Sequence, residues 1–251
     1  MDVMTCLLCF YGELADILSA PNSRGIVSCN VTRRTSIKDL IESIGPPHTE
    51  IERILVNSRE VDFSFIPRPG QVIGVHPFTP PADPCRPTLL RPDPLPGIRF
   101  LVDVNVGKLA RLLRMLGIDA AFDPAWKDAD LASIAAREAR IVLSRDHGLL
   151  KRSCIQWGRL IRADSPLEQL VEVLTFFGLK PPFALFTRCL ACNTELKPVS
   201  KAEIEDRLEP KTRRYYQRFR LCPGCQRIYW RGSHHQRMLG WVQKIMPRLT
   251  P

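Results

Sequence analysis

The sequence lacks long hydrophobic runs, although 45% of its 251 residues are hydrophobic and 25% are charged. A membrane-spanning helix needs about 20 consecutive apolar residues, so we expect no association with a membrane. The first residues, Met1–Met4, also lack the basic cluster that opens a secretory signal peptide. We therefore expect a cytoplasmic, globular protein that is long enough to form more than one domain.

The sequence also lacks the signs of a disulfide framework, because its nine cysteines are odd in number and follow no secretion signal. Four of them form two Cys-x-x-Cys pairs that are separated by 29 residues. Two such turns can supply the four thiolates of a closed tetrahedral site, and thiolates suit zinc. We predict a structural zinc ribbon whose ligands are Cys189, Cys192, Cys222 and Cys225.

Alternatives to this ligand set are a redox pair or four buried cysteines. A helix at residues 202–208 would account for the long spacer between the pairs. The nearby His234 and His235 could replace a ligand, but a surface or RNA-contacting role is the favoured interpretation. Cys6 and Cys9 lie in a predicted strand, where a separation of three places side chains on opposite faces. We expect no metal site from that pair.

Acidic residues are scarce in the last part of the chain. Residues 181–251 contain 14 Lys and Arg but 5 Asp and Glu, so they carry +9 of the chain's net charge of +10. A basic excess that is this localised predicts a polyanionic partner, and nucleic acid is the first candidate. The alternative is a solubilising surface.

Composition and periodicity divide the chain into four parts. Residues 1–78 predict a small β-grasp (α+β) domain with the order strand, strand, helix, strand, strand, in which Ser36 caps a helix over 37–44. Residues 79–97 contain seven prolines and predict a stiff, extended linker. Residues 98–182 alternate strands and helices, which predicts an α/β domain with a parallel sheet. Residues 183–251 form the basic, cysteine-bearing module.

Four aspartates lie where a parallel sheet collects its functional groups, at the carboxyl ends of strands. Asp103 and Asp146 directly follow the predicted strands 98–102 and 141–144. Asp128 and Asp130 open a predicted helix over 128–140, where helix capping is an alternative role. Converging carboxylates suit Mg²⁺ or Mn²⁺, which could activate water and stabilise charge on a phosphodiester. We predict these four as catalytic residues.

Basic residues near these carboxylates are candidates for phosphate contacts. Three of them recur at a spacing of three on a predicted helix over 104–116, and the fourth flanks Asp146: Lys108, Arg111, Arg114 and Arg145. The alternative for the helix residues is a solvated face. Aromatic side chains of the last module could stack on bases, namely Tyr215, Tyr216, Tyr229 and Trp230.

Several of these segments resemble a known family. The segments are 100–119, 139–146, 188–193 and 219–234, the last with the motif Tyr-Trp-x-Gly-Ser-His. They are similar to the Mut-7-type C-terminal RNase domain, a PIN-like nuclease with a zinc ribbon. Residues 1–78 resemble the ubiquitin-like domain, similar to ThiS and MoaD, that often precedes it.

The resemblance implies a ribonuclease that uses acidic residues and divalent metal, with Asp103, Asp128 and Asp146 as the matching acids and Asp130 as a further candidate. The first domain does not end in Gly-Gly, so we expect a protein-binding or scaffolding role for it instead of conjugation. The alternative function is a non-catalytic RNA-binding protein, associated with ribosomes or tRNA, in which the aspartates only cap helices.

Overall fold

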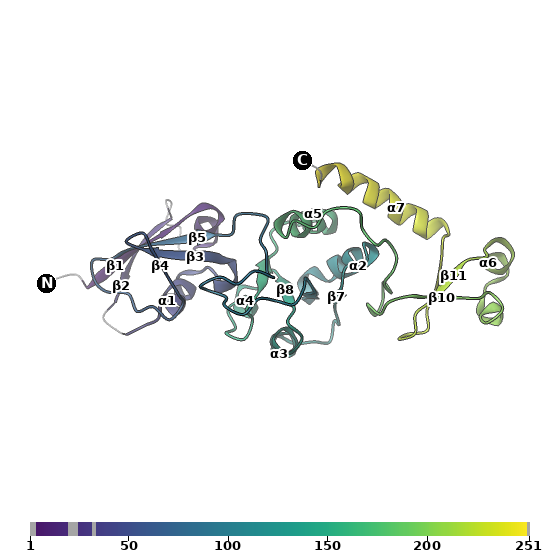
Figure 1. The fold of residues 1–251 in the computed structure, drawn as a ribbon, viewed down its shortest axis with the longest axis horizontal. Coiled ribbons are helices and arrows are strands. Elements are labelled where there is room, and N and C mark those ends of the chain that lie inside the picture. Colours follow the sequence, from purple (N-terminus) through teal and green to yellow (C-terminus); the bar gives the residue numbers. More distant parts are fainter. Residues whose placement is uncertain (1–3, 20–24, 32–33, 250–251) are drawn as a thin grey trace. The chain divides into compact units, whose positions relative to one another are not determined.

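The computed structural model describes residues 4–19, 25–31 and 34–249, so the predicted first domain begins outside the described residues. The chain divides into two compact units. Unit 1 comprises residues 1–105 and 125–160, and unit 2 comprises residues 106–124 and 161–251. Figure 1 shows the elements along the chain.

The first part of unit 1 is a mixed five-stranded sheet with the order β2-β1-β5-β3-β4. Strands β1 and β5 are parallel, and the other neighbours are antiparallel. The strands span Thr5–Phe10 (β1), Ile26–Asn30 (β2), Ile51–Val56 (β3), Arg59–Val61 (β4) and Val72–Pro77 (β5). The predicted order is confirmed, and β4 is an additional strand. Its three residues lack an apolar alternation, so the sequence pattern gave no sign of it.

Helix α1 spans Ile37–Ile44, as predicted. The Ser36 side chain accepts a hydrogen bond from the Asp39 amide at 3.1 Å and so caps the helix. Ile37 and Ile41 are fully buried in the core that the helix shares with the sheet. Gly45 follows the helix with a φ of 144°. Residues with a Cβ rarely adopt this backbone conformation, so a glycine here allows the chain to leave the helix.

The second part of unit 1 contains three parallel strands in the order β6-β8-β9. They span Phe100–Val102 (β6), Ile141–Ser144 (β8) and Gly158–Leu160 (β9), and all of their residues are buried. Burial along a whole strand is typical of a parallel sheet that is covered on both faces. Helix α3 (Asp128–Glu138) contacts β6 and β8, and the short α4 (His147–Leu150) contacts β8 and β9.

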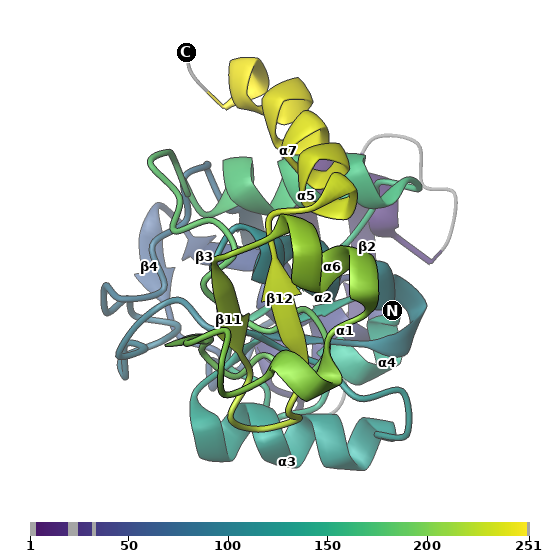
Figure 2. The same ribbon diagram turned by 90° about the vertical axis from the view of Figure 1, so that its right-hand side faces the viewer.

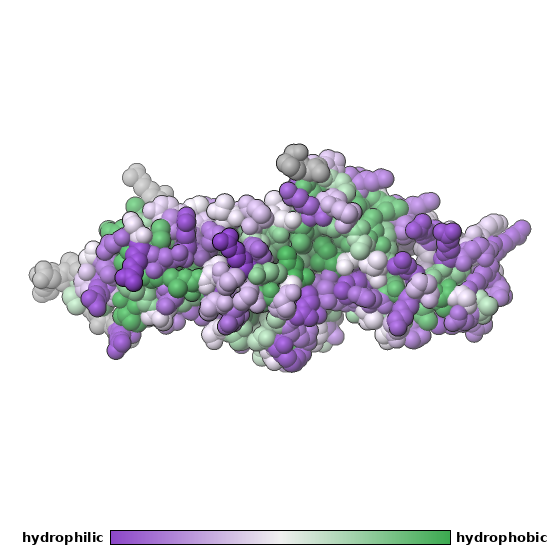
Figure 3. All heavy atoms as spheres, viewed as in Figure 1, coloured by the Kyte–Doolittle hydropathy of each residue, from purple (hydrophilic) through white to green (hydrophobic). Residues whose placement is uncertain are grey.

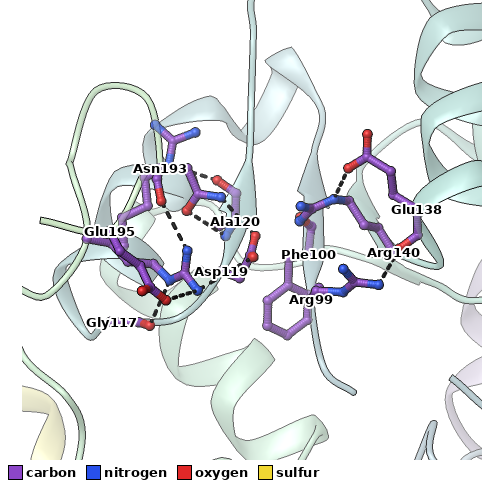
Figure 4. Close-up of polar contacts among 11 residues, drawn as sticks. Arg99, Phe100, Gly117, Asp119, Ala120, Glu138, Arg140, Asn193 and Glu195 are labelled. Atoms are coloured by element: carbon purple, nitrogen blue, oxygen red, sulfur yellow. Dashed lines mark hydrogen bonds and ion pairs between the residues drawn. The ribbon is translucent and has the colours of Figure 1, made fainter. Parts of the chain in front are cut away.

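Two arginines make polar contacts at the N-terminal ends of β6 and β8 (Figure 4). Arg140 bonds the Glu138 carboxylate at 2.7 Å and the Phe100 carbonyl at 3.1 Å. Arg99 donates to the Glu138 carbonyl at 2.7 Å. The bond from Arg140 lowers the pKa of the Glu138 carboxyl. These contacts fix the end of the sheet that lies opposite to the carboxyl ends of β6 and β8.

Residues 79–97 differ from the expected linker because they are packed into unit 1. Ala82, Leu90 and Leu95 are buried, and so is Arg91. The Arg91 guanidinium donates to the carbonyls of His48, Ile51 and Gln156 at 2.9, 2.8 and 3.0 Å. It also lies 4.7 Å from the centroid of the Trp157 ring. The proline-rich segment 79–97 is therefore packed, and through Arg91 it connects the first sheet to the residues that precede β9.

A buried ion pair makes a second connection within unit 1. Glu50 belongs to the 3-10 helix η2 (His48–Glu50) and is fully buried, yet it accepts from Arg159 at 2.8 Å and from the Leu160 amide at 2.7 Å. Arg159 of β9 also bonds Glu13 at 2.6 Å, in the 3-10 helix η1 (Gly12–Ile17). A buried carboxylate requires such partners because desolvation of its charge is costly.

Unit 2 contains the helices α2 (Gly107–Met115), α5 (Pro166–Phe176) and α7 (Ser233–Ile245) and the two-residue strand β7 (Ala120–Ala121). Helix α5 contacts both α2 and α7. Arg248, in the 3-10 helix η5 (Met246–Arg248), bonds Glu168 at 2.6 Å. Among the described helices, none has the length and apolar character that a membrane crossing needs.

The ribbon of unit 2 is an antiparallel three-stranded sheet with the order β10-β11-β12. Its strands span Lys197–Val199 (β10), Phe219–Leu221 (β11) and Ile228–Trp230 (β12). Between β10 and β11 lie the 3-10 helix η4 (Glu205–Arg207) and the helix α6 (Pro210–Tyr215), seen beside β11 and β12 in Figure 2. The predicted single helix over 202–208 is therefore wrong. Within that range only η4 is helical, and the longer helix α6 starts after it, with Pro210 at its N1 position. Helix α7 was not predicted.

Candidate functional site

Four cysteines converge in the ribbon, as the sequence predicts. The Sγ atoms of Cys189, Cys192, Cys222 and Cys225 all lie within 4.8 Å of one another, and within the described residues they form the one such group of three or more potential ligands. The distance from Cys189 to Cys225 is 3.5 Å, and that from Cys192 to Cys222 is 3.3 Å. Tetrahedral zinc with Zn–S bonds of about 2.3 Å places sulfurs about 3.8 Å apart. The cluster could therefore hold a metal such as zinc.

The two cysteine pairs have the same local geometry. In each pair the amide of the second cysteine donates to the sulfur of the first at 3.4 Å. The following residue, Asn193 or Gln226, has a left-handed φ of 70° or 60° and donates its amide to the carbonyl of the first cysteine. This repeated turn aims two sulfurs at one point, and its amides stabilise thiolates.

Two thiols of the cluster have pKa values that are shifted in opposite directions. Burial and the neighbouring cysteines raise the pKa of the Cys225 thiol to about 12. Burial would also raise the pKa of Cys192, but hydrogen bonding with Thr194 and the other cysteines lowers it to about 6. Thiolates repel one another at these distances, and a divalent ion bound between them would offset this repulsion.

The position of Arg114 contradicts the prediction that this residue contacts phosphate. It is 2% exposed, and it donates to the carbonyls of Ala120, Leu190 and Ala191 at 2.7, 3.2 and 2.7 Å. Burial lowers its pKa, although the Cys189 and Cys192 charges act in the opposite direction. Arg114 therefore anchors the first cysteine turn to α2. Helical spacing could not show which side of the helix would be buried.

A second set of polar contacts fixes the same turn (Figure 4). Asn193 donates to Asp119 at 2.8 Å and accepts from the Ala120 amide at 3.1 Å. Arg188 donates to the Gly117 carbonyl at 3.2 Å. Gly117 has a φ of 83°, and a Cβ there would lie 2.2 Å from the Ala184 carbonyl oxygen. The glycine is therefore needed where the end of α2 meets the segment that leads into the ribbon.

A network of polar side chains lies at the carboxyl ends of β6 and β8 in unit 1. Asp103 follows β6 and is buried, with 6% of its surface exposed. Its Oδ2 accepts from the Ser144 hydroxyl at 2.6 Å and from the Asn105 amide at 2.6 Å, and its Oδ1 accepts from the Val104 amide at 2.6 Å. Asn105 also donates to Ser144 at 3.2 Å. The carboxylate is thus held by neutral donors alone in these contacts.

Asp146 is connected to this network through Ser144. The Asp146 amide donates to the Ser144 hydroxyl at 2.8 Å, and its carboxylate accepts from the Gly148 and Leu149 amides at 2.6 and 3.3 Å. The Asp146 side chain therefore caps α4, and Asp146 is exposed to solvent. The structure brings Asp103 and Asp146 to one network, as parallel strands predict. Asn105 and Ser144 were not predicted, although Ser144 directly ends a strand.

The other two predicted acids lie at the start of α3. Asp130 accepts from the Lys127 amide at 2.9 Å and closes the first turn of the helix. Asp128 is half exposed, and its carboxylate lies 3.9 Å from Arg152. Within the described part of the chain, no three carboxylates have oxygens within 4.8 Å of one another. The structure therefore does not gather the four predicted acids into one cluster.

The remaining predicted basic residues are exposed. Lys108 and Arg111 lie on the exposed side of α2, and Arg145 follows β8. The Arg145 amide donates to the Asn105 side chain at 3.1 Å. Exposure leaves each of these side chains accessible to a phosphate, in contrast to Arg114.

These features define an α/β protein with an N-terminal mixed sheet, a polar centre on parallel strands and a ribbon whose four cysteines could hold a metal. The chain belongs to the Mut7-C RNAse domain family, whose model matches residues 98–242. Residues 3–83 match the Mut7-C ubiquitin model, so the N-terminal domain is ubiquitin-like. The predicted resemblance and fold class are confirmed, and the family supports a nuclease role.

The chain is also similar to a human protein named exonuclease mut-7 homolog. The two are 33% identical over 108 residues, which cover 41% of this chain and 12% of the human protein. The similarity thus concerns a small part of a much longer relative. No solved structure matches the chain significantly.

Proposed function

We propose that the chain is a divalent-metal-dependent ribonuclease whose reaction centre is the network of Asp103, Asn105, Ser144 and Asp146. The observation that carries this proposal is the buried Asp103 carboxylate, which is oriented by Ser144 and Asn105 at the carboxyl end of a parallel strand. Sites in such sheets collect at this edge. The family supplies the nuclease class, and these residues supply the chemistry within it.

The donor set fits a hard divalent cation. Mg²⁺ is commonly held by one or two carboxylates together with waters and substrate phosphates. Asp103 and Asp146 are the two carboxylates that would hold it. Such an ion, when bound, would lower the pKa of a water and stabilise charge on the phosphodiester. Mn²⁺ accepts the same ligands.

The side chains around Asp103 perform the positioning. Ser144 and Asn105 donate to one carboxylate oxygen and so fix its direction. Asp146 stays exposed and reaches a substrate from the neighbouring strand end. Asp128 remains a predicted catalytic residue, and Asp130 is assigned to helix capping.

Binding of RNA completes the proposal. Lys108, Arg111 and Arg145 are exposed cations that could hold phosphates. The four-cysteine cluster would hold zinc and keep the basic ribbon folded. A cytoplasmic location is part of the proposal, because four thiols stay reduced in that compartment. The ubiquitin-like domain would bind a protein partner through its surface.

The test compares RNA cleavage by four proteins with added Mg²⁺ or Mn²⁺. The parent should cut a labelled RNA, and Asp103→Asn and Asp146→Asn should each lose about 100-fold or more in rate, because loss of a metal ligand should cost at least as much as loss of an outer-shell partner. Asp93→Asn removes an exposed carboxylate from the proline-rich segment and should cut like the parent. Equal cleavage by all four proteins would contradict the proposed centre.

A second function, RNA binding without cleavage, is favoured by one observation. Asp146 and Asp130 both make helix-capping contacts, which is the role that this alternative assigns to them. The same assay separates the two functions. Binding of RNA by the parent and all variants, with no metal-dependent cleavage by any of them, would select the non-catalytic protein.

A further inference from the structure

Unit 2 contains a large groove beside the cysteine cluster, which we name the ribbon groove. It is lined by the ribbon strands, by α6 and by the start of α7, and its volume is about 1150 Å³. Small-molecule sites are typically about 300–1,000 Å³, so the groove suits a longer, chain-like ligand. In Figure 3 the surface over this part of the chain is mostly hydrophilic.

The lining of the ribbon groove is cationic. Five lining residues carry positive charge, and no aspartate or glutamate is among the described residues that line it: Arg111, Lys211, Arg218, Arg220 and Arg231. A smaller pocket of about 560 Å³ shares Arg111 and Tyr229 with the groove and adds Arg207 and Arg227. The positive surface thus extends past the groove as a track, which is what a polyanion would follow.

The same groove presents aromatic rings to solvent. Six of its lining residues are Phe, Tyr or Trp, and two of these are the exposed Tyr215 (68%) and Trp230 (38%). The Trp230 ring meets Tyr216 and Phe219 at 6.3 and 6.5 Å with interplanar angles of 50° and 56°. Neither neighbour stacks flat on Trp230. Tyr215 has the Arg214 guanidinium 5.5 Å from its ring centroid.

Exposed aromatic rings favour ligands that can cover them, and this preference distinguishes a single-stranded nucleic acid from other polyanions. Stacking of an aromatic ring on a base tightens binding by about 5- to 150-fold per base, and bases offer flat faces only where they are unpaired. A duplex presents phosphates but keeps its bases stacked inside. An acidic peptide would satisfy the arginines but not the rings. Cations alternating with exposed rings therefore favour a single strand.

We propose that the ribbon groove binds an unpaired stretch of RNA, with bases stacked on Tyr215 and Trp230 and phosphates bound by Arg218 and Arg231. This inference rests on the proposed function for the choice of RNA, and it deepens that function by naming single-stranded RNA as the substrate class. The groove acts as a holding site, separate from the reaction centre of unit 1. Discrimination between single and double strands would thus be made in the ribbon.

The first test measures binding by fluorescence anisotropy, with the full zinc-loaded chain and no added Mg²⁺ or Mn²⁺. The probes are an unstructured labelled RNA of 16 nucleotides and the same strand annealed to its complement. The single strand should bind at least about tenfold more tightly, in keeping with one stacked base. Equal affinity for the duplex would overturn the proposal, and so would equally effective competition by poly-glutamate of matched charge.

The second test removes a ring. Tyr215→Ala should raise the Kd for the single strand about 5- to 150-fold, which is the loss of one stacked base, whereas Tyr215→Phe keeps the ring and should bind like the parent. Trp241→Ala is the matched control, because Trp241 is an exposed aromatic of α7 that lies outside the groove lining. Unchanged affinity of Tyr215→Ala, with normal zinc content, would overturn the proposal.

A third test addresses the phosphates. Arg218→Ala should reduce the slope of log Kd against log salt by about 0.7, the value for one phosphate contact on a single strand. Arg137→Ala removes an exposed arginine of unit 1 and should leave the slope unchanged. An identical slope for Arg218→Ala and the parent would contradict the assignment of Arg218.

The outcomes for this inference and for the proposed function are distinguishable. Single-strand binding that depends on Tyr215, without metal-dependent cleavage, would reject the ribonuclease and keep the groove. Cleavage that depends on Asp103, with binding indifferent to Tyr215, would keep the ribonuclease and reject the groove.

Discussion

The ubiquitin-like domain of unit 1 and the ribbon of unit 2 are stabilised by different means. The sheet of the ubiquitin-like domain in unit 1 has a continuous core of 13 buried residues, and a buried ion pair joins this domain to β9. The ribbon of unit 2 has two apolar clusters of three buried residues each, and one of these includes two of the cysteines. A core of this size rarely suffices. The ubiquitin-like domain is therefore stabilised by apolar packing, whereas we expect the ribbon to depend on a metal held by its cysteines.

Removal of the metal should have the largest effect and should be confined to unit 2. Structural zinc contributes about 10–16 kcal/mol in small zinc modules, so Cys189→Ser or a strong chelator should unfold the ribbon. Hydrogen exchange should show loss of protection in residues 188–230 while β1–β5 stay protected. Metal analysis of the parent should give one zinc per chain. A ribbon that stays protected without metal would remove the contrast between the units.

Loss of the buried Glu50 charge should have the next largest effect, and it should be confined to unit 1. Breaking a buried ion pair costs about 3–5 kcal/mol, and we expect about 3 kcal/mol for Glu50→Gln because Arg159 still bonds Glu13. Urea denaturation measures this change, and zinc content should be unaffected. Glu60→Gln alters an exposed glutamate of β4 and should cost little. Equal stability of both variants would show that the pair is dispensable.

Ser144→Ala should lower activity without a matching loss of stability. Ser144 orients Asp103 and contacts Asp146, and loss of such an outer-shell partner typically costs about 10- to 100-fold in metal affinity or activity. We expect higher Mg²⁺ concentrations to restore part of the rate, which would mark a positioning role. Ser133→Ala, an exposed serine of α3, is the matched control. An unchanged rate and metal dependence would exclude Ser144 from the centre.

Asp130→Ala should have the smallest effect. A capping contact contributes about 0.3–1.5 kcal/mol, so the melting temperature should fall slightly while the cleavage rate per folded molecule stays the same. Asp128→Ala is the contrasting variant, because Asp128 lies in the same helical turn but stays a predicted catalytic residue, so this variant should lose rate where Asp130→Ala does not. A large loss of rate in Asp130→Ala would return this residue to the catalytic set.

Much of the fold could be predicted because its signals are local. Ser36 and the apolar spacing after it define α1, and the buried run Ile141–Ser144 defines β8 as a strand. The elements that were missed have weak local signals. Strand β4 has three residues with little apolar character, and α7 begins with the polar residues Ser-His-His directly after Gly232. Their structure depends on neighbours that are distant in sequence.

The candidate sites divide in the same way. The cysteine cluster was predictable since each pair makes its own turn, and the Asp103 and Asp146 positions followed from strand ends. Asn105 and Ser144 could not be assigned because their role depends on contacts between β6 and β8. Arg114 was misassigned, since helical spacing cannot show which face a neighbouring segment will cover. The packing of residues 79–97 was missed because seven prolines suggest extension and say nothing of burial.

The sequence by itself determined the metal-ligand spacing, the basic charge of residues 181–251 and the family of the chain. Each of these is a property of residues close together in the chain or of composition. Only the tertiary structure decided that Arg114 anchors the ribbon, that Arg91 and Glu50 are buried partners, and that aromatic and basic side chains line one groove. The physical reason is that burial and hydrogen bonding depend on which distant segments meet, and one-dimensional spacing does not contain that information.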